Sequence, residues 1–233
     1  MPTRYRDRRH AGQVLAQALS HYAHRDDVIV LALPRGGVPV AFEIARALRA
    51  PLDLFIVRKL GVPGQPELAM GAIADGGVRV LNRDVVEGLA ISAETIQQVT
   101  ERERAELRRR QQRYRGHRPP PDLRNRAVIL VDDGLATGAT MRAAVEAIRG
   151  QDPSRVVVAV PVAAASTAAW FRSWPQVDEF ICPLTPDPFF GVGLWYDDFH
   201  QVDDAEVRSL LAAAQALSSA QEAAPSPEDD SPP

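Results

Sequence analysis

The chain has 233 residues, of which 45% are hydrophobic, and a formal net charge of −3. This length suffices for one large α/β domain, and the small net charge gives no reason to expect a polyanionic partner. A single cysteine excludes an intrachain disulfide, and no apolar run reaches the roughly 18 residues that a membrane span needs. We therefore expect a cytoplasmic protein without a membrane partner.

In chain order, helical and strand patterns alternate from the beginning. Apolar residues recur at helical spacing over residues 11–23, and a continuous apolar run at 28–33 predicts a buried strand. A second helical pattern covers residues 40–48, and a second strand is predicted at 52–57. This order of strand, helix and strand is typical of a parallel sheet.

The middle of the chain departs from this alternation. Residues 61–77 hold five glycines and two prolines in 17 positions, which predicts a mobile loop. A short strand is expected at 78–81. A long helix is then predicted over residues 92–115, with Ser92 as its N-cap. This helix, with the residues up to 118, is interpreted as an insertion into the core.

The second half returns to alternating strands and helices. The predicted strands are 128–131, 156–162 and 178–182, and the predicted helices begin after residue 140, at 166 and at Asp203, the last ending near Leu217. Residues 218–233 are acidic and proline-rich, which predicts a disordered tail. We expect one domain over residues 1–217, with its core at about 26–200 and the inserted helix at about 92–118.

One segment carries most of the functional information. The apolar strand 128–131 runs into two carboxylates, Asp132 and Asp133, and then into a short loop and a helix. In an open parallel sheet the carboxylates lie at the carboxyl edge, where ligands bind. The loop's N–H groups and the helix N-terminus suit a phosphate, whereas the carboxylates suit vicinal hydroxyls or a cation. A sugar phosphate would satisfy both parts. The loop residues are Gly134, Leu135, Ala136, Thr137, Gly138, Ala139 and Thr140.

This segment resembles the phosphoribosyl pyrophosphate signature of type I phosphoribosyltransferases. The resemblance implies an α/β fold with an open parallel twisted sheet flanked by helices and a small C-terminal hood, to which this chain adds its long inserted helix. It also implies that Asp132 and Asp133 contact the ribose hydroxyls, while the loop up to Thr140 holds the 5′-phosphate.

Two basic segments are similar to further parts of the same family. Pro34-Arg35-Gly36-Gly37 resembles the pyrophosphate loop, although a plain β-turn is the alternative. Arg58-Lys59 ends a predicted strand, where relatives place basic residues toward pyrophosphate; a solvated pair is the alternative. The resemblance makes residues 61–77 the loop that closes over the reaction, with Glu67 as a candidate catalytic carboxylate or a solvated loop charge.

Residues 189–199 combine aromatic side chains with an acidic pair. They look like the C-terminal segment of purine-salvage phosphoribosyltransferases, which implies a base pocket at Trp195 and Tyr196, with Asp197 near the base and the metal. A core-packing edge strand is the alternative. Oxopurine enzymes carry an aspartate where this chain has Ala136, so an oxopurine acceptor is disfavoured.

The resemblance implies a Mg²⁺-dependent phosphoribosyltransferase. Its partners would be phosphoribosyl pyrophosphate and a small nitrogen acceptor, with a nucleobase as the first candidate and a homodimer left open. Arg35, Arg58 and Lys59 would stabilise the leaving pyrophosphate. The alternatives are a phosphoribosyl-pyrophosphate-binding regulator without catalysis and a competence-type accessory protein. The eight arginines between residues 102 and 118 are interpreted as a solvated helix face rather than a nucleic-acid surface.

Overall fold

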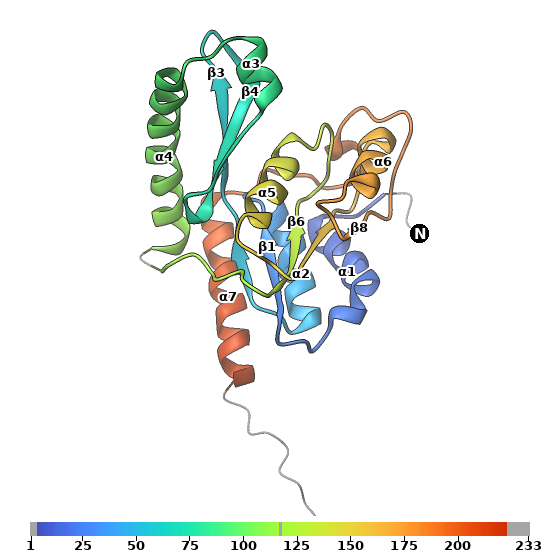
Figure 1. Ribbon diagram of the computed structural model, residues 1–233. Coiled ribbons are helices and arrows are strands. Elements are labelled where there is room, and N and C mark those ends of the chain that lie inside the picture. Colours follow the sequence, from blue (N-terminus) through green and yellow to red (C-terminus); the bar gives the residue numbers. More distant parts are fainter. Residues whose placement is uncertain (1–3, 117, 223–233) are drawn as a thin grey trace, which may run out of the picture.

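The computed structural model describes residues 4–116 and 118–222, and its centre is a five-stranded parallel sheet (Figure 1). The strand order is β2-β1-β6-β7-β8. The five strands are β1 (Val28–Ala32), β2 (Leu52–Leu54), β6 (Ala127–Val131), β7 (Arg155–Ala159) and β8 (Glu179–Ile181). The predicted parallel sheet is therefore confirmed.

The two central strands β1 and β6 place the functional loops. All five residues of each strand are buried, as is usual for parallel strands covered on both faces. The strands pair in register from Val28 opposite Ala127 to Ala32 opposite Val131. Both strands therefore leave the sheet at the same edge, and the loops that follow them meet there.

Helices cover both faces of the sheet, because alternate residues of each strand point to opposite sides. Val28 and Val30 face a core formed with α1 (Arg8–Ala18), α2 (Gly37–Leu48) and α7 (Asp204–Glu222). Ile29 and Leu31 face a second core formed with α5 (Ala139–Arg149) and α6 (Ala165–Ser173). Short 3-10 turns occur at Ser20–Tyr22, Asp75–Gly77 and Val192–Trp195.

A second, smaller unit stands apart from the sheet in Figure 1, and we call it the hairpin lobe. It comprises a three-stranded antiparallel sheet and two helices. Its elements are β3 (Val57–Val62), β4 (Gln65–Ala74), β5 (Arg79–Leu81), α3 (Arg83–Gly88) and α4 (Ala93–Arg115).

The loop predicted over residues 61–77 was wrong, because most of it forms β4. Gly71 shows why glycine does not indicate a loop here: a Cβ at this position would lie 2.4 Å from the Val80 carbonyl oxygen of the neighbouring strand. The strand predicted at 52–57 was also wrong in extent, because β2 ends at Leu54. Arg58 and Lys59 consequently lie inside β3 and not at a strand end.

The inserted helix α4 matches its prediction to within one residue and begins at the Ser92 cap. Its last residue, Arg115, is only 4% exposed, and this was not anticipated. The guanidinium bonds Asp53 Oδ1 at 2.7 Å, lies 2.8 Å from Asp75 Oδ2 and donates to the Leu54 carbonyl oxygen. A buried arginine thus fixes the end of the lobe to the core.

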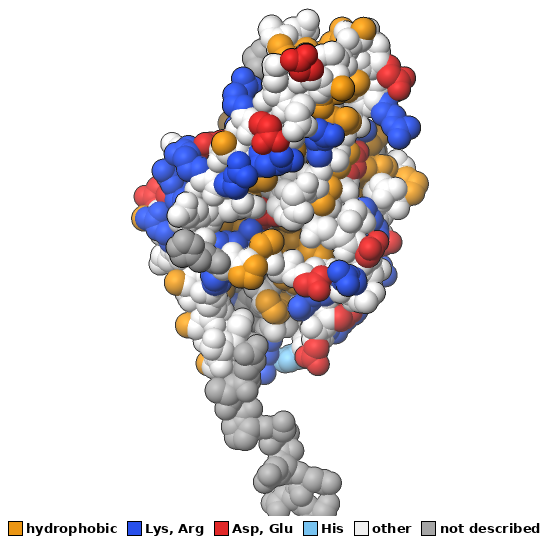
Figure 2. Space-filling model, turned by 60° about the vertical axis from the view of Figure 1, so that its left-hand side comes forward, with side chains coloured by type: hydrophobic (Ala, Val, Ile, Leu, Met, Phe, Trp, Pro, Cys, Tyr) orange, Lys and Arg blue, Asp and Glu red, His pale blue; other side chains and the backbone are white. Residues whose placement is uncertain are grey.

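The charged surface of the lobe is mixed in sign. Figure 2 shows Lys and Arg side chains over this part of the molecule with acidic side chains among them. Along α4, Arg104 pairs with Glu101, while Arg109 and Arg110 both bond Glu106. This pairing agrees with the interpretation as a solvated helix face.

Several helix boundaries differ from their predictions, most of all those of α1 and α7. α1 begins at Arg8 and ends at Ala18, whereas the pattern indicated residues 11–23. α7 continues to Glu222, so residues 218–222 are helical and were wrongly assigned to a disordered tail. Residues 223–233 lie outside the described residues. No helix of the described residues has the length and apolar character needed to cross a membrane.

Candidate functional site

The two loops at the carboxyl edge of β1 and β6 touch each other. A Cβ at Gly36 would lie 2.0 Å from Asp133 Oδ2, and one at Gly37 would lie 2.7 Å from the Val131 carbonyl oxygen. Only glycine permits this approach. The peptide bond between Pro34 and Arg35 is cis. The structure therefore brings together the two segments that the sequence assigned to ribose and pyrophosphate.

The acidic pair is partly buried and hydrogen-bonded. Asp132 Oδ1 accepts a hydrogen bond from the Asp133 N–H at 2.9 Å. Burial raises the pKa of Asp132, and the neighbouring Asp133 charge raises it further. Burial also raises the pKa of Asp133, although the guanidinium of Arg8 acts in the opposite direction. Burial thus disfavours the charged form of both carboxylates, and carboxylates with pKa values shifted in this way are common at ligand sites.

Arg8 is a contact of this pair that the sequence prediction missed. It is 7% exposed, and its Nε and Nη2 lie 2.9 and 2.8 Å from Asp133 Oδ2. A signal for its burial existed. Position 8 continues the apolar stripe of Ala11, Gly12 and Leu15 at helical spacing, and all four residues are buried.

The loop from Ala136 to Thr140 is largely exposed and ends at the N-terminus of α5. Within the described part of the chain, the N–H groups of Ala136, Thr137, Gly138 and Thr140 donate no hydrogen bond. Gly138 has φ +71°, and Thr167 Oγ1 fixes the loop by donating to the Ala136 carbonyl oxygen at 2.6 Å. Open N–H groups at a helix N-terminus form an anion site.

The basic residues predicted for pyrophosphate do not all converge. Arg35 follows β1 and lies 3.8 Å from Asp204 at the start of α7. Arg58 lies in β3 and is paired with Glu103 of α4 at 2.6 Å. Lys59 is its neighbour in the same strand. The backbone of Glu67 lies in β4, and its side chain is outside the described part.

The C-terminal segment reaches the acidic pair through one side chain. Tyr196 is buried and donates from its hydroxyl to the Asp133 carbonyl oxygen at 2.6 Å. Asp197 points outward, with a side chain that is 62% exposed and 3.9 Å from Arg4. The indole Nε1 of Trp195 is buried and has no hydrogen-bond partner among the described residues. Of the predicted base pocket, only Tyr196 is thus shown in contact with the loop.

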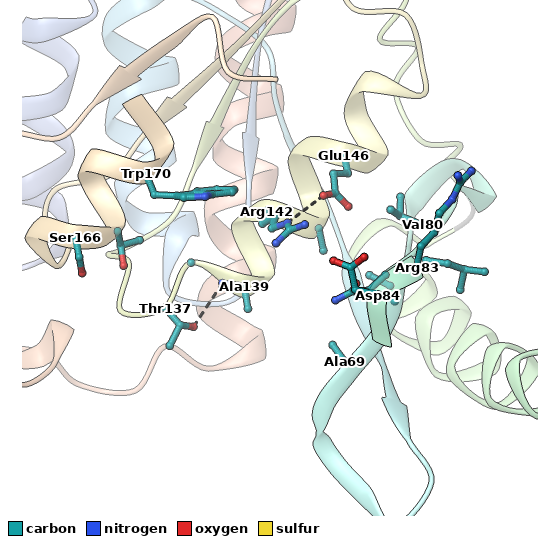
Figure 3. A pocket seen from close by; sticks show the side chains of 17 residues that line it. Ala69, Val80, Arg83, Asp84, Thr137, Ala139, Arg142, Glu146, Ser166 and Trp170 are labelled. Atoms are coloured by element: carbon teal, nitrogen blue, oxygen red, sulfur yellow. Dashed lines mark hydrogen bonds and ion pairs between the residues drawn. The ribbon is translucent and has the colours of Figure 1, made fainter. Parts of the chain in front are cut away.

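A cavity of about 630 Å³ opens on the other side of the phosphate loop, between the hairpin lobe and helices α5 and α6 (Figure 3). Thr137 and Gly138 line it, whereas Asp132 and Asp133 do not. Trp170 and Arg142 lie on the helix side of this cavity, with Asp84 across from them. No sequence pattern indicated this space, because its walls come from elements distant in the chain.

Comparisons with known proteins agree with this geometry. The phosphoribosyl transferase domain family matches residues 6–177. One relative is the Mycobacterium tuberculosis (strain H37Rv) protein Rv0571c, whose name describes it as a phosphoribosyl transferase and states no acceptor. It is 48% identical over 208 residues, which are 89% of this chain and 46% of that protein. The chain thus spans about half the length of the curated relatives it matches.

A solved structure agrees over nearly its whole length. The protein TT1426 from Thermus thermophilus is 42% identical, with a TM-score of 0.80, covering 90% of this chain and 98% of that chain. The matched family spans both β1 and β6 and the loops that follow them. On the family match and the parallel sheet with its two loops, the chain belongs to the type I phosphoribosyltransferase family.

Proposed function

We propose that this chain transfers the 5-phosphoribosyl group of phosphoribosyl pyrophosphate to a nitrogen acceptor and releases pyrophosphate. The observation that carries the proposal is the juxtaposition on one loop of a carboxylate pair and a run of open N–H groups. The carboxylates would accept hydrogen bonds from the ribose hydroxyls, and residues 134–140 would hold the 5′-phosphate. The proposed domain runs to the end of α7.

The leaving group would lie at the Pro34–Gly37 loop. Arg35 supplies a cation there, and the glycines let the backbone approach the ligand closely. The described residues hold no group of three metal-binding side chains, so a bound Mg²⁺ would depend mainly on pyrophosphate oxygens and water, with Asp197 as an exposed carboxylate that could complete its shell. When bound, Mg²⁺ neutralises charge on the leaving pyrophosphate.

The bond between ribose C1 and the pyrophosphate oxygen would break as a bond to the acceptor nitrogen forms. The electron pair leaves with pyrophosphate, and the acceptor loses its proton to solvent or base. Positive charge develops on the ribosyl ring, where the nearby Asp132 and Asp133 carboxylates stabilise it electrostatically. Much of the remaining catalysis would come from holding two reactants in line.

The acceptor is proposed to be a nucleobase other than an oxopurine. Ala136 stands at the loop position where oxopurine enzymes have an aspartate, and the aromatic segment 189–199 packs against the acidic pair through Tyr196. One observation favours a second candidate, a regulator that binds the same ligand without transfer. Arg58, expected at the pyrophosphate, is instead tied to Glu103.

Pyrophosphate release tests the proposal. The full chain with Mg²⁺ and phosphoribosyl pyrophosphate is given a panel of nucleobases, and an Asp132→Asn/Asp133→Asn variant serves as the control. Release that needs a base and falls by about a hundredfold or more in the variant would support the transferase. Ligand binding without release for any base would favour the regulator, and absence of binding would refute both.

A further inference from the structure

Arg8 lies outside every segment that resembles the family site, yet it is the cation nearest the acidic pair. Besides its two contacts with Asp133 Oδ2, its Nη1 donates to the His200 carbonyl oxygen at 2.7 Å. Its guanidinium carbon lies 3.8 Å from the centre of the Phe199 ring. All of its polar groups are thereby directed at the acidic pair or at the segment beside it. An arginine fixed on three sides has little freedom to leave.

The hydrogen bonds of the two carboxylates are divided in a specific way. Asp132 uses Oδ1 for the Asp133 N–H, and Asp133 uses Oδ2 for Arg8. Asp132 Oδ2 and Asp133 Oδ1 accept no hydrogen bond from the described residues, and neither oxygen is among the fully buried atoms that lack a partner. Each carboxylate therefore has one oxygen that a protein donor fixes and one oxygen that has no donor among the described residues.

We propose that Arg8 is a positioning residue of the ribose site, which holds Asp133 Oδ2 so that Asp133 Oδ1 and Asp132 Oδ2 together accept hydrogen bonds from two vicinal hydroxyls. The proposal rests on the proposed function, since it assigns the hydroxyls to a phosphoribosyl ligand. The groups that face Asp133 are Arg8 from α1, Asp132 from its own loop and the Tyr196 hydroxyl from the C-terminal segment.

Two neighbouring facts support a positioning role over a purely structural one. Arg8 bonds the Asp133 oxygen that lies nearest Gly36, where an added Cβ would lie only 2.0 Å away, so the glycine leaves room for the oxygen that the ion pair fixes. Arg8 also contributes positive charge that opposes the effect of burial on the pKa of Asp133, which helps keep it an acceptor.

The test uses metal-free sugar phosphates and the full chain. Affinities for ribose 5-phosphate, 2-deoxyribose 5-phosphate and inorganic phosphate are measured by calorimetry for the native chain and for Arg8→Met, Arg8→Lys and Arg25→Met. Arg25 is the control for the loss of one paired arginine, because its Nε and Nη2 bond the two oxygens of a single aspartate, Asp27, near the opposite end of β1. Circular dichroism melting checks the fold of each variant.

We expect the native chain to prefer ribose 5-phosphate over its deoxy analogue by about tenfold, as for a hydrogen bond to a charged acceptor. Arg8→Met should lose most of this preference while inorganic phosphate binding changes less than about twofold. Arg8→Lys should retain part of it, and Arg25→Met all of it.

Two results would overturn the role of Arg8 alone. In one, Arg8→Met keeps the native preference for ribose 5-phosphate. In the other, it loses ribose 5-phosphate and inorganic phosphate in equal measure, which is the signature of a structural role. If the native chain itself shows no preference between the two sugars, the proposed function fails first and the role of Arg8 fails with it.

Discussion

The two ends of the proposed ribose phosphate site are built in different ways. At the hydroxyl end, a buried arginine bonds one carboxylate of the pair, Gly36 leaves room for that carboxylate, and a tyrosine from another part of the chain bonds the Asp133 main-chain carbonyl oxygen. At the phosphate end, the binding groups are N–H groups of an exposed loop at a helix N-terminus. A phosphate brings its own charge and needs only oriented N–H dipoles to bind it. Buried protein carboxylates, in contrast, need hydrogen-bond and charge partners, because burial disfavours their charged form.

The largest effect should follow from filling the space at the hydroxyl end. Gly36→Ala would place a methyl group against Asp133 Oδ2, so the carboxylate or the loop has to shift. We expect a stability loss of about 1–3 kcal/mol and ribose 5-phosphate binding weaker by about tenfold. Gly88→Ala is the control, because a Cβ there meets nothing within 4 Å. Calorimetry measures the affinity of both variants for ribose 5-phosphate, and thermal melts measure their stability. Equal losses in the two variants would contradict the prediction that the hydroxyl end depends on the space at Gly36.

A second prediction concerns stability at the hydroxyl end. Because the pKa of Asp132 is raised in the folded protein, folding binds more protons at intermediate pH, and stability falls as pH rises from the unfolded pKa, about 3.9, through the folded value. Asp132→Asn removes this loss. At pH 7 its free energy of unfolding should therefore be about 1 kcal/mol higher than that of the native chain, although the variant loses its preference for ribose.

The melting curves across pH give the sign. The difference between Asp132→Asn and the native chain should shrink toward acid, since protonated Asp132 resembles asparagine. A difference that grows toward acid would show that the charged carboxylate stabilises the fold. Burial of Asp132 would then carry no cost to the stability of the hydroxyl end.

At the phosphate end a side-chain change should matter less. Thr137→Ala removes a hydroxyl but leaves the open N–H groups of the loop unchanged. Because main-chain donors and the helix N-terminus would hold the anion in the proposed site, we expect inorganic phosphate binding to weaken by no more than about threefold. Calorimetry with inorganic phosphate measures it, and a loss approaching that of Gly36→Ala would mean that the two ends depend equally on side chains.

The smallest effect is expected on the hairpin lobe. Hydrogen bonds from Arg109 and Arg110 lower the pKa of Glu106 to about 2, yet the two arginine side chains are 62% and 41% exposed to solvent. Glu106→Gln should change the unfolding free energy by less than about 0.5 kcal/mol, because water and salt screen surface pairs. Urea unfolding at low and high salt would reveal a larger contribution if the helix pairs acted as a network.

Much of the fold was predictable, because β1 and β6 are continuous apolar runs between clear loops, and the motif after β6 resembles a known ligand signature. The hairpin lobe was not, since its glycines serve close strand contacts, as at Gly71, and composition does not distinguish these from loop glycines. Arg8 and Arg115 were missed for another reason. Their carboxylate partners lie far away in sequence, so both resembled solvated surface charges.

The contacts of Arg8 have a consequence for the order in which the molecule forms. Arg8 is 125 residues from Asp133 and 192 residues from His200, and Tyr5 forms a bridge with Tyr196. The chain-entropy cost of closing a loop grows only slowly with its length, and the sheet itself pairs Val28 with Ala127, so the contact of Arg8 with Asp133 can form together with the sheet. During synthesis, the contacts of Arg8 with His200 and of Tyr5 with Tyr196 can form only after these late residues have left the ribosome, whereas the last strand of the parallel sheet ends earlier, at Ile181.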